Sequence, residues 1–130
     1  MSTIRVLHVE DEPDIRDVVE ISLSMDPDLV LRQCDSGAEA LAIAGRWEPD
    51  IILLDVMMPR MDGPETLALL RDNPSTAPIP VVFMTARAQP RELARFRNLG
   101  AVGVIAKPFD PMTLASNIRA HVRPPGLSTT

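Results

Sequence analysis

The sequence predicts an α/β fold in which a parallel sheet of five strands carries helices on both faces. Apolar strand-like runs alternate five times with amphipathic helical segments along the 130 residues. Repeated strand–helix units imply parallel strands joined by right-handed crossovers. Four of the five strand runs are almost continuously apolar, which is typical of strands covered on both faces.

The strand runs are short and are separated by polar or turn-forming residues. The second run contains Arg32 and Gln33, so we expect this strand to lie at an edge of the sheet. The expected strands cover Ile4–Val9, Leu29–Cys34, Ile51–Leu54, Ile79–Met84 and Val102–Ala106.

The segments between the strands carry apolar residues at helical spacing. Pro13 suits the first turn of the first helix, and Ser36 with Glu39 forms an S-x-x-E capping box ahead of the second. Asp62 and Gly63 lead into the third helix. The apolar positions expected to face the core are Ile15, Val18, Val19, Leu23, Leu41, Ala44, Leu67, Leu70, Leu93, Phe96, Leu114, Ala115, Ile118 and Val122.

The length and composition indicate one globular domain. Hydrophobic residues make up 45% and charged residues 24% of the chain, while aromatic residues make up only 3%. The core is therefore expected to be mainly aliphatic, and a chain of this size can bury enough apolar surface to fold without disulfides. We expect the domain to span residues 1–123 and a flexible tail to span residues 124–130, after the Pro124–Gly126 stretch.

Charge and cysteine content exclude several classes of function. The net charge of −5 and the scattered basic residues count against direct DNA binding, because phosphate neutralisation needs clustered Lys and Arg. The single cysteine, Cys34, cannot form an internal disulfide and belongs to no zinc-type spacing. No apolar run approaches the roughly 20 residues that span a bilayer, and no export signal is evident. We expect a cytoplasmic protein without membrane association.

Polar residues lie at the carboxyl ends of four of the expected strands. Glu10 and Asp11 follow the first strand, Asp55 follows the third, Thr85 the fourth and Lys107 the fifth. Ligands of open parallel sheets bind beyond the carboxyl ends of the strands. We therefore expect these five side chains to meet at one edge of the sheet.

The charges of this group favour a divalent cation and a phosphoryl group. Three ionised carboxylates carry about −3 and Lys107 returns about +1, so either the carboxyl pKa values rise or a cation binds. Mg²⁺ prefers one or two carboxylates together with waters and phosphate oxygens. A carboxylate such as that of Asp55 can form an aspartyl phosphate, and phosphoryl transfer depends mainly on positioning and charge neutralisation.

Each of these residues also has a purely structural interpretation when it is taken alone. Acidic residues after a strand often complement a helix N-terminus, a lone Asp or Thr is often a cap, and a Lys before Pro often lies at the surface. Their joint position after successive strands favours the functional interpretation. For His8, Cys34, Trp47 and His121 the structural interpretation, packing or surface exposure, is preferred.

Four motifs carry a resemblance to a known family. They are Val9-Glu10-Asp11-Glu12, the block from Asp55 to Gly63, Met84-Thr85-Ala86 and Lys107-Pro108-Phe109. From Ile4 to Val122 the chain resembles the receiver domain of two-component response regulators. The resemblance implies a flavodoxin-like (βα)5 fold with strand order 2-1-3-4-5, a function as a phospho-accepting signalling protein, and chemistry limited to its own phosphorylation and slow dephosphorylation.

The resemblance also implies a role for each site residue. Asp55 is expected to accept the phosphoryl group. Asp11, Asp55 and the backbone carbonyl of Met57 are expected to ligate Mg²⁺ or Mn²⁺, with Glu10 acting mostly through a metal-bound water. Lys107 is expected to pair with Asp55 and later with the phosphoryl oxygens.

Further roles follow from the same resemblance. Thr85 is expected to bond the phosphoryl group, and Ala86 to leave access to it open. The peptide bond between Lys107 and Pro108 is expected to be cis. The implied partners are a sensor histidine kinase or a histidine phosphotransfer protein and an output protein that the sequence does not identify.

Three features depart from the commoner family pattern. Ile105 stands where the family usually has an aromatic residue that swings inward on activation, so a different output mechanism is expected. The segment Ala101–Val104 lacks the acidic residues that related transcription factors use in dimer salt bridges, which indicates a monomer or weak dimer. Met57 and Arg87 occupy positions that tune the access of water. Because Met57 cannot strongly hydrogen-bond a water, we expect slow self-dephosphorylation.

Alternative interpretations remain open at this stage. The sequence could be a receiver that acts alone, or a fragment of a larger regulator or hybrid kinase with Pro124–Gly126 as a linker. A phosphohydrolase with an Asp nucleophile commonly has a second acid two residues after the nucleophile, where this chain has Met57, and a cap domain. A flavodoxin-like binding module needs a phosphate-cradling loop, but here the acidic turn after the first strand repels an anion.

Overall fold

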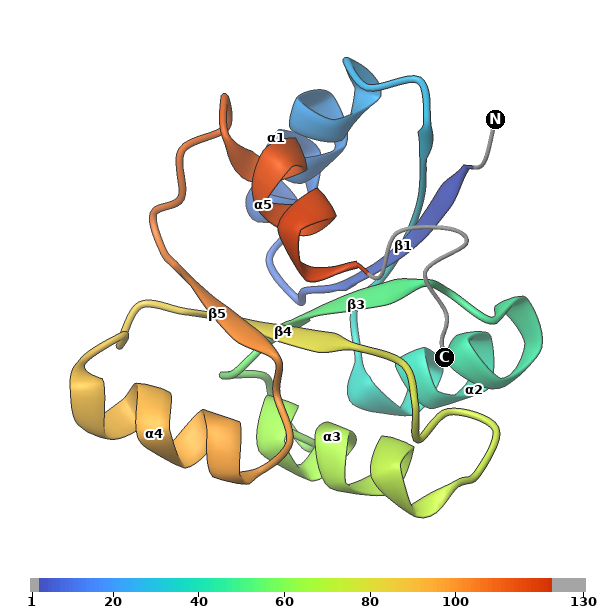
Figure 1. Cartoon of the computed structure of the whole chain (residues 1–130), viewed down its shortest axis with the longest axis vertical. Coiled ribbons are helices and arrows are strands. Elements are labelled where there is room, and N and C mark those ends of the chain that lie inside the picture. The colour runs from blue at the N-terminus through green and yellow to red at the C-terminus, as the bar shows by residue number, and fades with distance from the viewer. Residues whose placement is uncertain (1–2, 123–130) are drawn as a thin grey trace.

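The computed structural model describes residues 3–122, which form one parallel sheet and five helices (Figure 1). The strand order is β2-β1-β3-β4-β5, and all four strand pairs are parallel. The expected fold class and strand order are confirmed. The tail expected at residues 124–130 lies outside the described residues. The elements are β1 Ile4–Val9, α1 Pro13–Ser24, β2 Leu29–Cys34, α2 Gly37–Trp47, β3 Ile51–Asp55, α3 Gly63–Asp72, β4 Val81–Thr85, α4 Pro90–Asn98, β5 Gly103–Ala106 and α5 Leu114–His121.

Helices cover both faces of the sheet (Figure 1). Helices α1 and α5 lie on one face, and α2, α3 and α4 lie on the other. Each face has its own apolar core, because successive side chains of a strand point to opposite faces. Val19, Leu53 and Leu114 belong to the core beside α1 and α5. The other core contains the two buried aromatic rings of Phe83 and Phe96, whose centroids are 4.9 Å apart.

The sheet is most apolar at its centre and more polar at its edges. Every residue of β3 and β4 is buried, as strands with a neighbour on each side and helices on both faces must be. Strand β2 forms one edge, as predicted, and Arg32 of this strand is exposed and lies over the ring of Trp47 at 4.9 Å. Among residues 3–122, no helix has the length and apolar character needed to cross a bilayer.

The observed strand ends differ slightly from the expected ones. Asp55 and Thr85 are the last residues of β3 and β4 and do not follow them. The reason is that the sheet hydrogen bonds continue to the end of both strands, where the Val56 N–H donates to the Met84 carbonyl at 3.1 Å. Strand β4 begins at Val81, two residues later than expected, because Pro80 has no N–H to donate.

The start of α3 is fixed by a reciprocal cap that the sequence prediction placed elsewhere. The Asp62 side chain accepts a hydrogen bond from the Glu65 N–H at 2.9 Å, and the Glu65 carboxylate accepts one from the Asp62 N–H at 3.0 Å. This capping box closes at α3, whereas at α2 the structure shows the hydroxyl of Ser36 accepting from the Glu39 N–H at 3.2 Å. The cap satisfies two backbone N–H groups at the start of α3.

Candidate functional site at the carboxyl edge of the sheet

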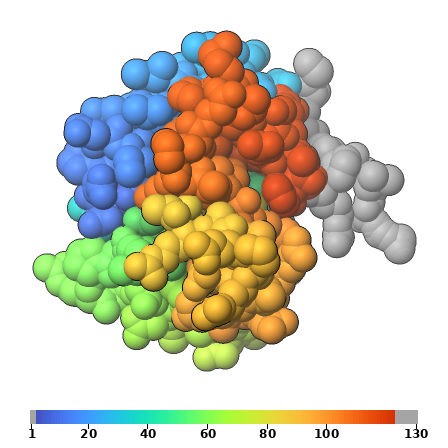
Figure 2. Space-filling view, turned by 90° about the vertical axis from the view of Figure 1, so that its left-hand side faces the viewer, coloured from blue at the N-terminus to red at the C-terminus, as the bar shows by residue number. Residues whose placement is uncertain are grey.

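Four strand ends bring the predicted site residues to one edge of the sheet. Glu10 and Asp11 follow β1, Asp55 ends β3, Thr85 ends β4 and Lys107 follows β5. These four strands are neighbours in the order β1-β3-β4-β5. In the space-filling view, segments from these distant parts of the chain adjoin on this face as blue, green, yellow and orange atoms (Figure 2).

Three carboxylates form a compact cluster at this edge. One oxygen from each of Glu10, Asp11 and Asp55 lies within 4.8 Å of the others. Glu10 is 0% and Asp55 5% exposed, whereas Asp11 is half-buried. An oxygen-only ligand set with one side open to water fits a hard divalent cation such as Mg²⁺, which retains several waters when it is bound. The residues present therefore fit the expected ion.

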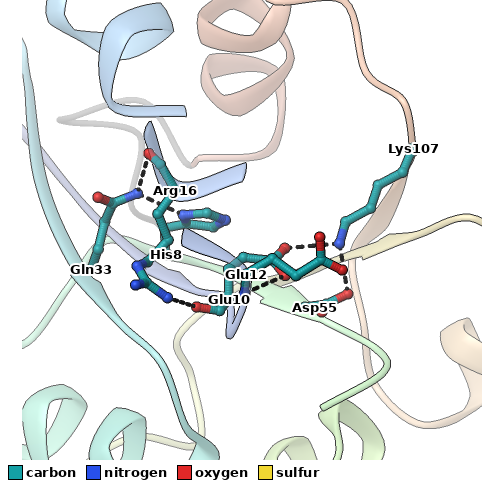
Figure 3. A network of polar contacts seen from close by, with 7 residues as sticks. All are labelled: His8, Glu10, Glu12, Arg16, Gln33, Asp55 and Lys107. Atoms are coloured by element: carbon teal, nitrogen blue, oxygen red, sulfur yellow. Dashed lines mark hydrogen bonds and ion pairs between the residues drawn. The ribbon is translucent and has the colours of Figure 1, made fainter. Parts of the chain in front are cut away.

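Lys107 joins the two buried carboxylates of the cluster, Glu10 and Asp55 (Figure 3). Its Nζ atom lies 2.8 Å from Oε1 of Glu10 and 3.0 Å from Oδ1 of Asp55. Burial acts to lower the pKa of Lys107, but the hydrogen bonds to Glu10 and Asp55 outweigh it and raise the pKa. The ammonium group therefore stays charged and compensates part of the negative charge of the cluster.

The carboxyl group of Glu10 shows that this compensation is incomplete. Burial raises the pKa of Glu10 to about 7; its hydrogen bond with Lys107 acts in the opposite direction, and the charge of Asp55 raises the pKa further. Two of three carboxylates thus share a single lysine in a site with little solvent. A divalent cation would relieve the remaining repulsion.

A cavity lies at the ends of β3 and β4, next to the residues that follow Asp55 in the chain. Thr85 is buried, and its hydroxyl accepts a hydrogen bond from the Arg87 N–H at 3.0 Å. Val56, Met57, Thr85, Ala86 and Arg87 line one shallow cavity together with residues of α4. Ala86 is exposed, and the side chain of Met57 is 77% exposed. The cavity therefore adjoins the residues that follow Asp55 and Thr85 in the chain.

The remaining predicted positions lie on or near β5. Ile105 is 7% exposed, lies opposite Met84 in the sheet and belongs to the apolar core beside α5. The peptide bond between Lys107 and Pro108 is cis. Ile105 thus already occupies the interior in this structure.

The residues interpreted as structural are placed as expected. His8 and Cys34 are buried, and Trp47 ends α2 and packs against the core. His121 ends α5, where its Nδ1 atom lies 2.8 Å from the carbonyl of Asn117.

One residue in contact with the backbone of the site was missed by sequence reasoning. Arg16 Nη1 donates a hydrogen bond to the carbonyl oxygen of Glu10 at 2.7 Å (Figure 3). Arg16 is the only basic residue in α1, and this was the one available signal. The periodicity of the helix does not reveal that its guanidinium turns back to the end of β1.

An open parallel sheet with an acidic cluster and a lysine at its carboxyl edge defines a class of α/β domains that combine a cation with phosphoryl chemistry. The chain belongs to the response regulator receiver domain family, whose model matches residues 6–119. The match includes every site residue named above.

Curated relatives share this domain within longer proteins. The DNA-binding dual master transcriptional regulator RpaA of Synechocystis is 35% identical over 119 residues, which cover 92% of this chain and 49% of that protein. The response regulator PleD of Caulobacter vibrioides is 40% identical over 120 residues, covering 92% of this chain and 26% of that protein. The chain thus spans half or less of the length of these relatives.

Solved structures show the same fold. The chemotaxis protein CheY4 of Vibrio cholerae superposes with a TM-score of 0.86 at 30% identity, covering 93% of this chain and 100% of that one. The receiver domain of the response regulator NarL from Mycobacterium tuberculosis gives a TM-score of 0.82 at 28% identity, covering 92% and 96%.

Membership of this family establishes the general function. Receiver domains take part in phosphoryl-acceptance signalling, generally bind Mg²⁺ at an acidic cluster, and interact with histidine kinases or phosphotransfer proteins and with output proteins. The family is generally non-enzymatic. The comparisons do not favour the phosphohydrolase or flavodoxin-like binding module that the sequence left open.

Proposed function

We propose that Asp55 accepts a phosphoryl group in a reaction that depends on a divalent cation. The observation that supports this role is the convergence of three carboxylates and Lys107 within hydrogen-bonding or ligand-sharing distance at the carboxyl edge. Asp55 is the member of the cluster whose chain neighbours, Val56 and Met57, line the cavity at the ends of β3 and β4. It is therefore the carboxylate best placed to meet a phosphodonor.

Mg²⁺, or Mn²⁺ in its place, would be held by Asp11, Asp55 and the backbone carbonyl of Met57, with Glu10 acting without direct contact. The bound ion supplies charge neutralisation for the transferred group. Lys107 compensates the charge of the buried Glu10 carboxylate, which lies 2.8 Å from its Nζ atom. Asp11, which is half-buried, leaves room for the waters that Mg²⁺ retains.

The chemical step is an in-line transfer to an oxygen of Asp55. A new oxygen–phosphorus bond forms, the bond from phosphorus to the donor histidine nitrogen breaks, and its electron pair leaves with the imidazole. Lys107, now 3.0 Å from Asp55, then pairs with the phosphoryl oxygens. The Thr85 hydroxyl accepts from Arg87 at present, and its own proton is free to be donated to the same group.

The output is proposed to be phosphorylation-dependent binding of a partner protein by residues 1–123. Ile105 is a buried aliphatic residue, so the signal is carried by something other than the rotation of an aromatic ring. We further propose a monomer or weak dimer that acts in the cytoplasm and whose receiver domain does not contact DNA. Its chemistry is limited to its own phosphorylation and dephosphorylation.

Slow loss of the phosphoryl group is proposed from the residues beside Asp55. The side chain of Met57 is exposed next to the acceptor and cannot orient an attacking water by a strong hydrogen bond, and Arg87 flanks the same cavity. We expect the isolated phosphorylated protein to persist for minutes or longer when its decay is followed by intact mass. A half-life of seconds would contradict this.

The acceptor is tested by intact-mass measurement after incubation with acetyl phosphate, with and without Mg²⁺. We expect one phosphoryl group per chain in the presence of Mg²⁺ and none in its absence. The Asp55→Asn variant should remain unlabelled, and Asp17→Asn, which alters an exposed aspartate of α1, should label as the wild type does. Labelling of Asp55→Asn would place the acceptor elsewhere, and turnover of many equivalents would indicate a phosphohydrolase.

A further inference from the structure

A polar network lies behind the acidic turn, which we define as residues 10–12 between β1 and α1 (Figure 3). It consists of His8 in β1, Arg16 in α1 and Gln33 in the edge strand β2. His8 lies opposite Gln33 in the register of the sheet. None of the three is among the carboxylates and lysine of the site, and the proposed phosphoryl transfer does not use them.

Gln33 fixes the orientation of this network. Its side-chain nitrogen lies 3.0 Å from the carbonyl oxygen of Arg16 and 2.9 Å from Nδ1 of His8. A carbonyl oxygen only accepts hydrogen bonds, so the NH₂ group of Gln33 must face Arg16. The second amide hydrogen then points to His8, whose Nδ1 accepts it, and the neutral ring carries its proton on Nε2.

His8 is held in the neutral state by its surroundings. It has no exposed surface, and burial lowers its pKa to about 3, with further contributions from the positive charges of Lys107 and Arg16. Its Nε2 atom has no hydrogen-bond partner within residues 3–122, which is unfavourable in the interior. An aliphatic residue at position 8 would avoid that penalty but would leave an amide hydrogen of Gln33 without its acceptor.

Arg16 connects the network to the acidic turn. Its Nη1 donates to the carbonyl oxygen of Glu10 at 2.7 Å, and its backbone N–H donates to the carbonyl of Glu12 at 3.2 Å. Arg16 thus binds both ends of the acidic turn. The carbonyl of Arg16 also accepts a hydrogen bond from Gln33 of the edge strand. The guanidinium thus contacts the backbone of the turn, while the Glu10 carboxylate is bonded to Lys107 and to the Glu12 N–H.

We propose that Gln33, His8 and Arg16 are positioning residues that hold the acidic turn in the conformation that a divalent cation requires. The carboxylates of Glu10, Asp11 and Asp55 repel one another, yet lie within 4.8 Å, and the turn would relax outward if its backbone were free. The network opposes this movement from the side remote from the ion. This inference rests on the proposed cation site and assigns the affinity of that site partly to residues outside it.

The test is a direct titration of Mg²⁺ by calorimetry without a phosphodonor. Arg16→Met and Gln33→Met remove the donors and keep similar side-chain length. We expect each to bind Mg²⁺ about tenfold more weakly or worse, as found when groups that orient metal ligands are removed. Arg16→Lys, which keeps one cationic donor, should recover part of the affinity. The control is Arg32→Met. Arg32 lies in β2 beside Gln33 but is exposed and outside the network, so this variant should bind Mg²⁺ as the wild type does.

A second measurement separates positioning from a merely structural role. In phosphorylation by acetyl phosphate, the Mg²⁺ concentration for half-maximal rate should rise with the loss of affinity, while the rate at saturating Mg²⁺ stays within about twofold of the wild type, since the reacting groups are unchanged. Lower thermal stability of Arg16→Met and Gln33→Met with unchanged Mg²⁺ affinity would overturn the inference.

The outcomes also distinguish this inference from the proposed function. If wild-type protein binds Mg²⁺ and is labelled while both methionine variants bind equally well, only the inference fails. If wild-type protein binds no Mg²⁺, the proposed cation site itself fails. Should Arg16→Met not fold, Gln33→Met decides the question, because Gln33 is a half-buried residue at the edge of the sheet.

Discussion

Glu10 and His8 lie two residues apart in the chain and are both buried, and burial moves their pKa values in opposite directions. The pKa of Glu10 is raised from 4.5 to about 7, and that of His8 is lowered from 6.5 to about 3. Between pH 4.5 and 7 the folded protein retains a proton on Glu10 that the unfolded chain has released, so Glu10 lowers the free energy of unfolding as the pH rises. Between pH 3 and 6.5 only the unfolded chain protonates His8, so His8 lowers the free energy of unfolding as the pH falls.

The two residues therefore oppose each other in weakly acidic, metal-free solution. We expect Glu10→Gln to lose stability on acidification from about pH 6.5 to 5, because His8 then acts alone, and His8→Phe to gain stability over the same range. Each slope is limited to about 1.4 kcal/mol per pH unit. Urea unfolding with a chelator measures both slopes, and two variants that both follow the wild-type curve would contradict the assignment.

The contact between the start of α3 and the end of β3 determines how closely the acceptor is held. The Gly63 N–H donates to the carbonyl of Val56 at 2.9 Å, and a β-carbon at position 63 would lie 2.5 Å from the carbonyl oxygen of Asp55 and 2.9 Å from Cα of Val56. Because these neighbours are backbone atoms, they cannot move aside without displacing the end of the strand. Glycine at this position is thus required by close approach.

We expect Gly63→Ala to lower the free energy of unfolding by about 1–3 kcal/mol, the usual range for forced overpacking, and to slow labelling of Asp55. The matched control is Gly45→Ala, since a β-carbon at Gly45 in α2 meets nothing within 4 Å. That change should stabilise the protein by up to about 1 kcal/mol through helix propensity. Denaturant unfolding of both variants gives the comparison, and equal effects of the two changes would exclude the steric explanation.

At the scale of the whole molecule, the carboxylates that would bind a cation at the carboxyl edge of the sheet lower the stability of the metal-free protein. We expect Asp11→Ala to raise the free energy of unfolding by about 1 kcal/mol without metal, because it removes one of three crowded carboxylates. Mg²⁺ at about 100 times its dissociation constant should stabilise the wild type by about 2.7 kcal/mol and the Asp11→Ala variant far less. Thermal or urea unfolding with and without Mg²⁺ measures both effects. A clear loss of metal-free stability in Asp11→Ala would contradict the crowding of the carboxylates.

Much of the fold was predictable because its signals are local in the sequence. The apolar runs of β3 and β4 reflect burial on both faces, and the polar residues of β2 identified the edge of the sheet. Strand ends were less predictable, because Asp55 and Thr85 are assigned to their strands by hydrogen bonds to neighbouring strands. Capping was predicted at Ser36, but the reciprocal box formed at Asp62, where the turn geometry allows both bonds.

The sequence by itself determined the alternation of strands and helices and the position of Glu10, Asp11, Asp55 and Lys107 at strand ends. Periodicity and strand order suffice for this, since parallel strands send their carboxyl ends to one edge. Only the tertiary structure decided how the charges of that edge are balanced. The Lys107 ammonium contacts two carboxylates, and the Arg16 guanidinium contacts the Glu10 carbonyl. Both contacts depend on the directions of side chains that come from different elements. No local pattern of residues encodes those directions.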